Sequence, residues 1–159
     1  RDSFSSEEPV LNTATKATHA TDSALAHNDQ CEDTALTVLN DASRQLAEYF
    51  AGNRKSFELL LDVPTPPLTF RNRAQHALRS IPYGTHWTYA QLAQAAGSEG
   101  AVRAAGSACA TNPLPIVVPC HRVVRADGHI GAYRGGPETK KFLLELEERH
   151  SRELSSGNR

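Results

Sequence analysis

The sequence predicts a mixed α/β (α+β) fold whose C-terminal half contains a winged-helix-like helix-turn-helix domain. Three observations predict it: helical apolar periodicity recurs along the chain, short β-branched runs stand between the helical segments, and two short helical segments meet at Gly97. The 159 residues, 39% of them hydrophobic, suffice for one or two small cores. A proline cluster at residues 64–67 is the expected linker.

The N-terminal third gives weaker signals. Residues 1–33 are rich in Thr, Ala, Ser, Asp and Glu without a helix or strand period, so we expect a poorly ordered or divergent segment. Apolar residues at helical spacing predict a helix over Thr34–Ala51, and alternating residues predict a strand over Ser56–Val63. The expected divisions are 1–33, 34–67 including the linker, 68–150 for the second domain, and a tail at 151–159.

Three helices are expected after the linker. Phe70–Ile81 has one apolar face behind the N-cap Thr69, and a capping box at Thr88–Gln91 opens a helix that Gly97 ends. Ser98 is the expected cap of a third helix reaching about Ala110. These last two helices, joined at one glycine, predict the helix-turn-helix.

The third helix is unusual because residues 100–108 are small apart from Val102 and Arg103. Small side chains let a helix approach another surface closely, and Arg103 could insert where that surface opens. They also allow close packing in a core with Arg103 merely solvated. The segment alone leaves both interpretations open.

The C-terminal part is expected to hold a buried strand at Ile116–Val118, which Pro119 ends. A hairpin turn is expected at Ala126–Gly128. Pro137 suits the first position of a final helix, and its apolar face is formed by Phe142, Leu143 and Leu146.

Pro119 places Cys120 and the adjacent His121 at the mouth of the expected sheet. A thiolate is a nucleophile, and a neighbouring imidazole can accept the thiol proton. A small buried cysteine beside an incidental histidine is the alternative for such a pair taken alone.

Charge and cysteine content limit the possible functions. Residues 1–69 carry a net charge of −6 and residues 70–150 one of +4, which is compatible with a nucleic-acid face or with an ordinary mixed surface. Three scattered cysteines form no disulfide framework and no CxxC pair, so no zinc site is indicated and a reducing cytoplasm is expected. No apolar stretch suits a membrane span or a signal peptide.

A set of motifs in residues 70–147 resembles the O6-alkylguanine-DNA alkyltransferases, also called methylated-DNA-protein-cysteine methyltransferases, in order and spacing. The motifs are Ile81-Pro-x-Gly, Thr88-Tyr89-x-x-Leu92-Ala93, Arg103-Ala104-x-Gly106-x-Ala108, Asn112-Pro113, Ile116-x-x-Pro119-Cys120-His121-Arg122-Val123, Gly128-x-x-Gly131-x-Tyr133-x-Gly135-Gly136 and Lys140-x-x-Leu143-Leu144-x-x-Glu147. A weaker similarity reaches back over residues 47–52. The resemblance implies a ribonuclease H-like N-terminal domain, here truncated or divergent.

The resemblance also implies a mechanism of direct damage reversal. A damaged guanine is flipped out of the duplex, and Cys120 takes its O6-alkyl group irreversibly and without a cofactor. His121 would remove the thiol proton through a water molecule, and Glu147 would orient His121. Asn112 would brace the turn beside the cysteine, and Tyr89 would donate a proton toward the guanine ring.

The implied DNA-binding helix lies in the minor groove, where Arg103 takes the place of the flipped base. The residues implied to contact DNA are Ala101, Arg103, Ala104, Gly106 and Ser107. The residues implied to form the substrate pocket are Tyr89, Pro115, Val123, Tyr133 and Arg134. Arg134 could narrow this pocket or contact a phosphate, and Cys109 is interpreted as a packing residue.

The expected partner is double-stranded DNA containing O6-alkylguanine, with O4-alkylthymine as a further substrate. We expect a monomer that binds no metal and no membrane, located in the cytoplasm and associated with the nucleoid if bacterial. Three alternatives are considered. A non-repairing lesion binder would lack Cys120, a Cys-His hydrolase would need an oxyanion hole, and a helix-turn-helix regulator would carry several base-reading side chains.

Overall fold

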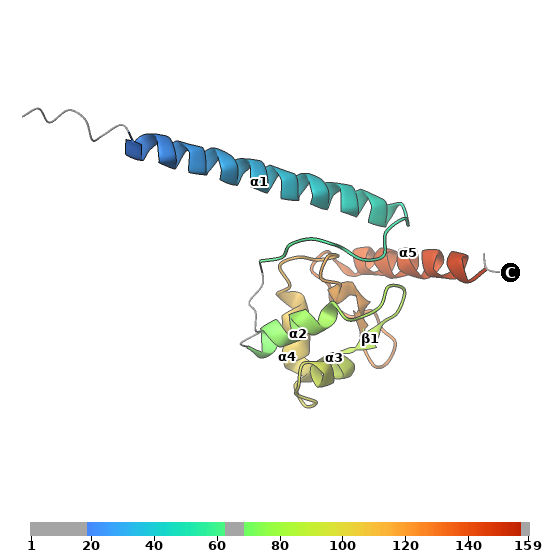
Figure 1. Ribbon diagram of the computed structural model, residues 1–159. Coiled ribbons are helices and arrows are strands. Elements are labelled where there is room, and N and C mark those ends of the chain that lie inside the picture. The colour runs from blue at the N-terminus through green and yellow to red at the C-terminus, as the bar shows by residue number, and fades with distance from the viewer. Residues whose placement is uncertain (1–18, 63–68, 157–159) are drawn as a thin grey trace, which may run out of the picture. The chain divides into compact units, whose positions relative to one another are not determined.

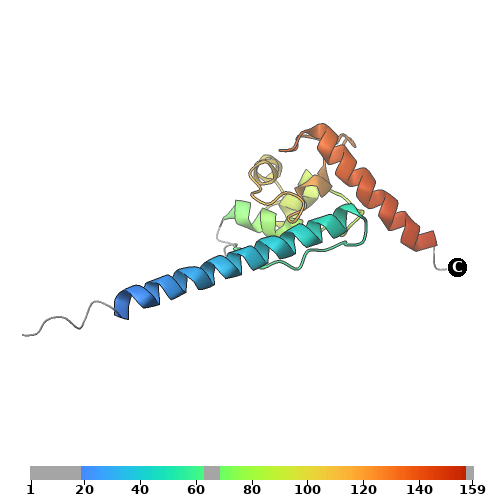
Figure 2. The ribbon, with the colours of Figure 1, turned by 90° about the horizontal axis from the view of Figure 1, so that it is seen from above.

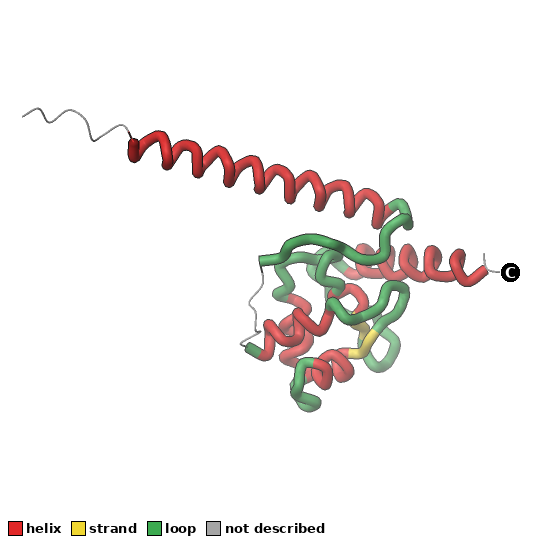
Figure 3. The backbone as a smooth tube through the Cα atoms, viewed as in Figure 1, coloured by secondary structure: helices red, strands yellow, loops and turns green. Residues whose placement is uncertain are grey.

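The computed structural model describes residues 19–62 and 69–156, which divide into two compact units between Asp41 and Ala42. The chain runs from the long helix α1 (His19–Phe50) to the C-terminal helix α5 (Pro137–Ser156) (Figure 1). Helices dominate the described residues, and strands are few (Figure 3). This composition agrees with the predicted mixed class.

The first unit, as far as it is described, is the N-terminal part of α1. The helix predicted over Thr34–Ala51 is confirmed, but it already begins at His19. The expectation of poor order is therefore wrong for residues 19–33, and residues 1–18 lie outside the described part. The physical reason is that His19–Phe50 contains neither proline nor glycine and several alanines, so helix propensity extends the helix beyond its apolar period.

In the second unit the strand predicted at Ser56–Val63 is wrong for residues 56–62, which form an irregular segment; Val63 is not described. The backbone of Glu58 bonds to a side chain instead of a neighbouring strand. Its N–H donates to Gln45 Oε1 at 2.8 Å, and its carbonyl accepts from Gln45 Nε2 at 3.2 Å. Alternation in sequence does not make a strand without a partner strand.

Three helices form the main core: α2 (Phe70–Leu78), α3 (Tyr89–Ala95) and α4 (Val102–Ala110). Figure 2 shows them as short helices in the same part of the molecule. The buried side chains that they share are apolar and mostly small; they include Ala74, Leu78, Leu92, Ala93, Ala105 and Ala108. Small residues bring the helix axes close together.

The predicted caps are confirmed for two of these helices. Thr69 accepts a hydrogen bond from Asn72 N, and Thr88 forms the capping box with Gln91. The predicted cap Ser98 is wrong, because its carbonyl accepts from Ala101 N in a turn and α4 starts after Ala101. α2 also ends at Leu78, three residues before the predicted Ile81.

The sheet consists of two short parallel strands, β1 (Trp87–Thr88) and β2 (Val123–Val124). Trp87 pairs with Val123 and Thr88 with Val124. The predicted turn at Ala126–Gly128 is present, with Gly128 at φ +82°, but it closes no two-stranded hairpin because β2 pairs with β1.

The strand predicted at Ile116–Val118 is also wrong. Ile116 has a φ of +76°, and Val118 N donates to Leu114 O at 2.9 Å, so the segment is a tight turn. It leads into a short 3-10 helix, η1 (Cys120–Arg122). A positive φ at a β-branched residue is rare and is imposed here by the surrounding bonds.

Pro137 starts α5 as predicted. Leu143 and Leu146 are buried, whereas Phe142 is 52% exposed, so its predicted place on the apolar face is wrong. Leu143 and Leu146 form a second core cluster with Tyr49. Within residues 19–62 and 69–156, no helix has the length and apolar character needed to cross a membrane.

Candidate active site

Cys120 begins η1 and is 2% exposed. The side chain of Asn112, 1% exposed, connects it to the preceding turn. Asn112 Nδ2 donates to Cys120 Sγ at 3.0 Å and to Val118 O at 2.7 Å, while its Oδ1 accepts from Leu114 N at 3.1 Å. Asn112 therefore fixes both the turn and the sulfur.

The Cys120 thiol is held in its protonated form at neutral pH. Burial raises its pKa, and the hydrogen bond from Asn112 and the charge of Lys140 offset this rise only in part. Lys140 is fully buried, and its Nζ donates to Val123 O at 2.6 Å. Because the thiolate is the nucleophilic form, Cys120 needs a base to remove its proton.

Glu147 on α5 is the centre of a buried polar network behind the cysteine. His121 Nε2 lies 2.8 Å from its Oε1, Arg122 donates to both carboxylate oxygens at 2.9 Å, and Gly84 N donates to Oε2 at 3.0 Å. Burial would raise the pKa of Glu147, but the hydrogen bonds from His121 and Arg122 outweigh it and lower the pKa to about 2. Glu147 is therefore an anion at neutral pH.

His121 is fully buried and is held neutral. Burial lowers its pKa, although Glu147 acts in the opposite direction. Its Nδ1 is buried and has no hydrogen-bond partner among the described residues. A neutral imidazole that donates Nε2–H to Glu147 keeps a free lone pair on Nδ1, which is what a general base requires.

Tyr49 is a member of this network that the sequence did not identify. Its hydroxyl donates to Glu147 Oε1 at 2.7 Å and lies 3.4 Å from His121 Nε2. In the helix predicted over Thr34–Ala51, Tyr49 counts only as one of the apolar residues, and the weaker similarity over residues 47–52 gives it no role. A tyrosine among buried apolar residues was the available signal, because a buried hydroxyl usually finds a polar partner.

A cavity of about 350 Å³ opens onto Cys120. Its walls come from α3, α4, η1 and the loop before α5; they are Tyr89, Gly106, Cys109, Ala110, Cys120, Ala132, Tyr133 and Arg134. Pro115 and Val123, both expected in the substrate pocket, are not among these wall residues. Val123 is fully buried in the core, where its carbonyl holds Lys140.

Tyr89 and Cys109 bring weakly acidic groups to this cavity. Burial raises the pKa of Tyr89, so its hydroxyl remains protonated and can donate a proton. Gly131, at φ +75°, lets the backbone lie close to Tyr89, because a Cβ there would be 3.1 Å from the Tyr89 hydroxyl. Burial raises the pKa of Cys109 to about 12, so this second thiol stays protonated.

A second cavity, of about 420 Å³, lies along the exposed side of α4. Its walls are Thr88, Tyr89, Ala90, Val102, Arg103, Gly106, Arg125, Ala126, Gly131 and Ala132. It shares Tyr89, Gly106 and Ala132 with the Cys120 cavity, so the two are adjacent. Among the expected DNA-contacting residues, Arg103, Ala104 and Ser107 are exposed, and Ala101 and Gly106 are half-buried.

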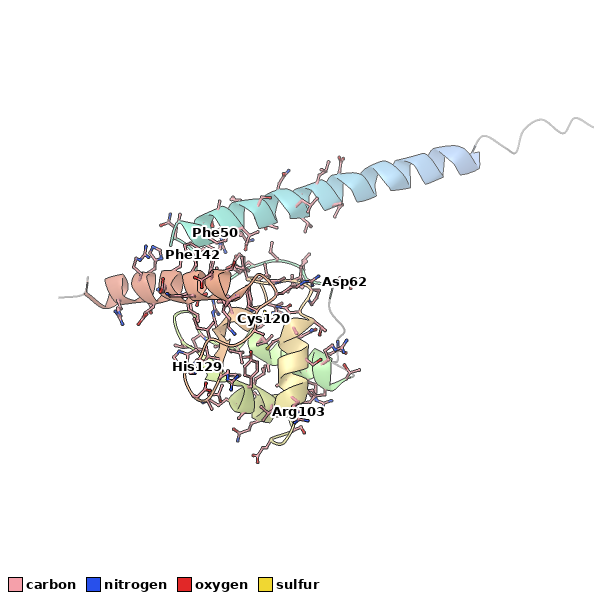
Figure 4. All side chains as sticks on the ribbon, turned by 180° about the vertical axis from the view of Figure 1, so that it is seen from behind. Phe50, Asp62, Arg103, Cys120, His129 and Phe142 are labelled. Carbon is pink, nitrogen blue, oxygen red and sulfur yellow. The ribbon has the colours of Figure 1, made fainter. Side chains whose placement is uncertain are left out.

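Arg103 lies on the first turn of α4, and Cys120 lies among the helices (Figure 4). Arg103 makes no ion pair with any residue that the structure describes. Apart from the exposed Val102, the remaining residues of the α4 surface are small, so this face presents one long cationic side chain beside a concave surface.

Comparisons with known proteins cover both parts of the chain. Residues 69–149 match the family model described as the DNA-binding domain of 6-O-methylguanine DNA methyltransferase, and residues 11–63 match its ribonuclease-like domain. The methylated-DNA--protein-cysteine methyltransferase of Mycolicibacterium paratuberculosis is 46% identical over 110 residues, 69% of this chain and 66% of the relative. The constitutive enzyme of Bacillus subtilis is 47% identical over 110 residues, with the same coverage.

Solved structures give the same result. The crystal structure of Mycobacterium tuberculosis O6-methylguanine methyltransferase matches with a TM-score of 0.65 and 42% identity, covering 70% of this chain and 66% of that one. The structure of Mycobacterium tuberculosis OGT in complex with DNA matches with a TM-score of 0.66 and 42% identity, covering 70% and 68%. The chain thus spans about two thirds of the length of the relatives it matches.

Proposed function

Because this chain belongs to the 6-O-methylguanine DNA methyltransferase family, we propose that it repairs O6-alkylguanine in DNA by moving the alkyl group irreversibly to Cys120. The observation that carries the proposal is the buried Cys120 thiol on a cavity wall, with the His121–Glu147 pair behind it. The arrangement combines a nucleophile, a base and a group that orients the base.

The reaction starts with proton removal from Cys120. The thiol proton passes through a water molecule to Nδ1 of His121, and Glu147 stabilises the imidazolium that forms. The sulfur then attacks the alkyl carbon in line. A C–S bond forms as the bond between this carbon and guanine O6 breaks, and the electron pair of the broken bond stays with guanine.

Guanine leaves as an anion unless it is protonated. The Tyr89 hydroxyl, on the wall of the same cavity, donates its proton to a ring nitrogen of the leaving base. The proton taken up by His121 balances the one that Tyr89 gives away, and solvent exchange restores both residues. No cofactor is needed because the thiol is itself the acceptor, and the thioether product ends the protein's activity.

The α4 face delivers the damaged base. Ala101, Ala104, Gly106 and Ser107 keep the helix surface low enough for the narrow minor groove, and Arg103 fills the space of the extruded nucleotide. The cavity beside Arg103 adjoins the Cys120 cavity through Tyr89, so the flipped base moves only a short way.

The proposed partner is duplex DNA carrying O6-alkylguanine, and O4-alkylthymine is a second proposed substrate. Tyr133 and Arg134, on the cavity wall, are proposed to line the substrate pocket. We further propose that the protein acts as a monomer in the cytoplasm, near the nucleoid if its source is bacterial.

The test is an intact-mass measurement after incubation with a duplex containing O6-methylguanine. The protein should gain the mass of one methyl group, and peptide mapping should place it on Cys120. Cys120→Ala should bind the duplex but gain nothing, and Cys109→Ala should react like the wild type. Label on Cys109 or Cys31, or binding without transfer, would contradict the proposal.

A further inference from the structure

The hydroxyl of Tyr49 is buried within the active-site network, although Tyr49 lies in the segment that matches the ribonuclease-like domain. Its side chain is fully buried and donates to Glu147 Oε1 across 98 residues of sequence. The other side chains of the network, His121, Arg122 and Glu147, come from the segment that matches the DNA-binding domain. Tyr49 thus brings a side chain of the N-terminal segment into this site.

We propose that Tyr49 is a positioning residue: its hydroxyl holds the Glu147 carboxylate against His121 and fixes the imidazole tautomer that can accept the Cys120 proton. The inference rests on the proposed alkyl transfer to Cys120. Tyr49 does not touch the reacting atoms, and its effect passes through Glu147 and His121.

The tautomer follows from where the hydroxyl proton goes. A tyrosine hydroxyl has one proton, and Tyr49 gives it to Glu147 at 2.7 Å. Its oxygen therefore presents lone pairs to His121 Nε2 at 3.4 Å, beside the carboxylate oxygen at 2.8 Å. Two acceptors around Nε2 require a proton on that nitrogen, which leaves Nδ1 unprotonated and free to act as the base.

Three charged groups act on the pKa of His121, and all are opposed or aided by its burial. Glu147 and Lys140 face it from α5, and Arg122 lies next to it in η1. Burial raises the pKa of Tyr83, in the turn before β1, and the charges of Glu147 and Arg122 also act on it. Tyr49 and Arg122 both donate to Oε1 of Glu147, the oxygen that His121 uses, and Tyr49 is the uncharged one of the two donors. Removing the Tyr49 hydroxyl leaves more negative charge on Glu147 to stabilise the imidazolium, so the pKa of His121 should rise.

Tyr83 provides a matched control in the same aromatic cluster. Its ring lies 6.0 Å from that of Tyr49 at an interplanar angle of 83°. Its hydroxyl is also buried, but it has no hydrogen-bond partner within the described residues. Tyr83→Phe therefore deletes a buried hydroxyl from the cluster without removing a bond to Glu147.

The experiment compares the wild-type chain, Tyr49→Phe and Tyr83→Phe in their reaction with free O6-benzylguanine, which requires no base flipping. The second-order rate constant is measured from about pH 5 to pH 9, where a general base near neutrality shows its titration. Thermal melting of each variant verifies that it is folded at the assay temperature.

Tyr49→Phe should react about tenfold more slowly at neutral pH, a part of the contribution that general base catalysis makes. The acid limb of its pH-rate profile should move to higher pH, whereas Tyr83→Phe should keep the wild-type rate and profile. A loosened core would slow the reaction equally at all pH values. An unshifted profile for Tyr49→Phe, or the same shift in both variants, would overturn the inference.

A double-variant comparison separates this inference from the proposed function. If Tyr49 acts through Glu147, Tyr49→Phe should have little further effect on the rate in a Glu147→Gln background. Full additivity of the two changes would contradict the inference while leaving alkyl transfer intact. Failure of the wild-type protein to react with O6-benzylguanine would instead count against the proposed function.

Discussion

The buried network beside Cys120 and the exposed face of α4 differ in burial and bonding. In the network, His121 and Glu147 are at most 1% exposed. Glu147 accepts hydrogen bonds from Tyr49, Gly84, His121 and Arg122. On α4, by contrast, the face that carries Arg103 is exposed, and Arg103 pairs with no carboxylate of the described residues. Proton transfer needs fixed geometry, which buried and hydrogen-bonded side chains supply. Entry into a groove needs little bulk. Changes in the buried network should therefore affect stability and chemistry together, whereas changes on the exposed face of α4 should affect only the binding and flipping of DNA.

The largest expected effect on stability comes from breaking the buried pair. Arg122→Leu leaves the Glu147 carboxylate buried without its main cation, a change that typically costs about 3–5 kcal/mol. Urea unfolding should show this loss, whereas Arg103→Leu on α4 should change the free energy of unfolding by no more than about 0.5 kcal/mol.

Arg122→Leu/Glu147→Leu should be more stable than Arg122→Leu alone, because the buried Glu147 charge that lost its cation is removed as well. Equal losses for Arg122→Leu and Arg103→Leu would contradict the contrast between the two regions.

Arg103→Ala should leave stability unchanged and impair the repair of duplex DNA. The substitution removes the side chain that compensates for unstacking the flipped base, and unstacking costs roughly a few kcal/mol for an intact base pair. Repair of O6-methylguanine in duplex DNA should slow strongly, while the reaction with free O6-benzylguanine and the melting temperature should change little. An unchanged ratio of duplex to free-base rates would make Arg103 a purely structural residue.

The buried network should also set the acid stability of the protein. The pKa of Glu147 is about 2 when folded, below its ordinary value of 4.5, so the unfolded chain binds the proton more readily. The stabilisation from ionised Glu147 is complete above about pH 4.5 and is lost as the pH falls toward 2. Stability measured across this window should fall less steeply for Glu147→Gln than for the wild type. Parallel curves would contradict this assignment.

The smallest expected effect concerns Arg134, which is exposed on the wall of the Cys120 cavity. If it contacts a phosphate, Arg134→Ala should lower the slope of log affinity against log salt by about 0.9. The rate with O6-benzylguanine should stay the same. An unchanged slope with a faster benzylguanine reaction would show that Arg134 narrows the pocket instead.

The sequence predicts best where local chemistry decides the structure. The Thr69 and Thr88 caps and the start of α5 at Pro137 depend on neighbouring residues, and the structure confirms them. The predicted strand over Ser56–Val63 fails because a strand needs a partner, which alternation does not reveal. The strand predicted at Ile116–Val118 fails because Asn112 bonds to Leu114 and Val118 and closes a turn, in which Ile116 has a φ that isoleucine rarely adopts.

The candidate site divides in the same way. Cys120 and His121 are adjacent in sequence, so their joint chemistry is visible in the motif. Glu147 enters through a family resemblance, and its distance of 2.8 Å from His121 comes only from the structure. The sequence offers only a weak signal for Tyr49, a tyrosine among apolar residues, and its partner Glu147 lies 98 residues away, so the hydrogen bond between them comes only from the structure.

The central claim is that one buried thiol is consumed by one lesion, and a titration tests it most directly. The protein is mixed with an excess of O6-methylguanine duplex, and repaired guanine is counted until the reaction stops. The amount repaired should equal the amount of active protein, with Cys120 methylated and no further turnover. Continued repair beyond one equivalent, or a plateau that leaves the Cys120 thiol unmodified, would contradict the account.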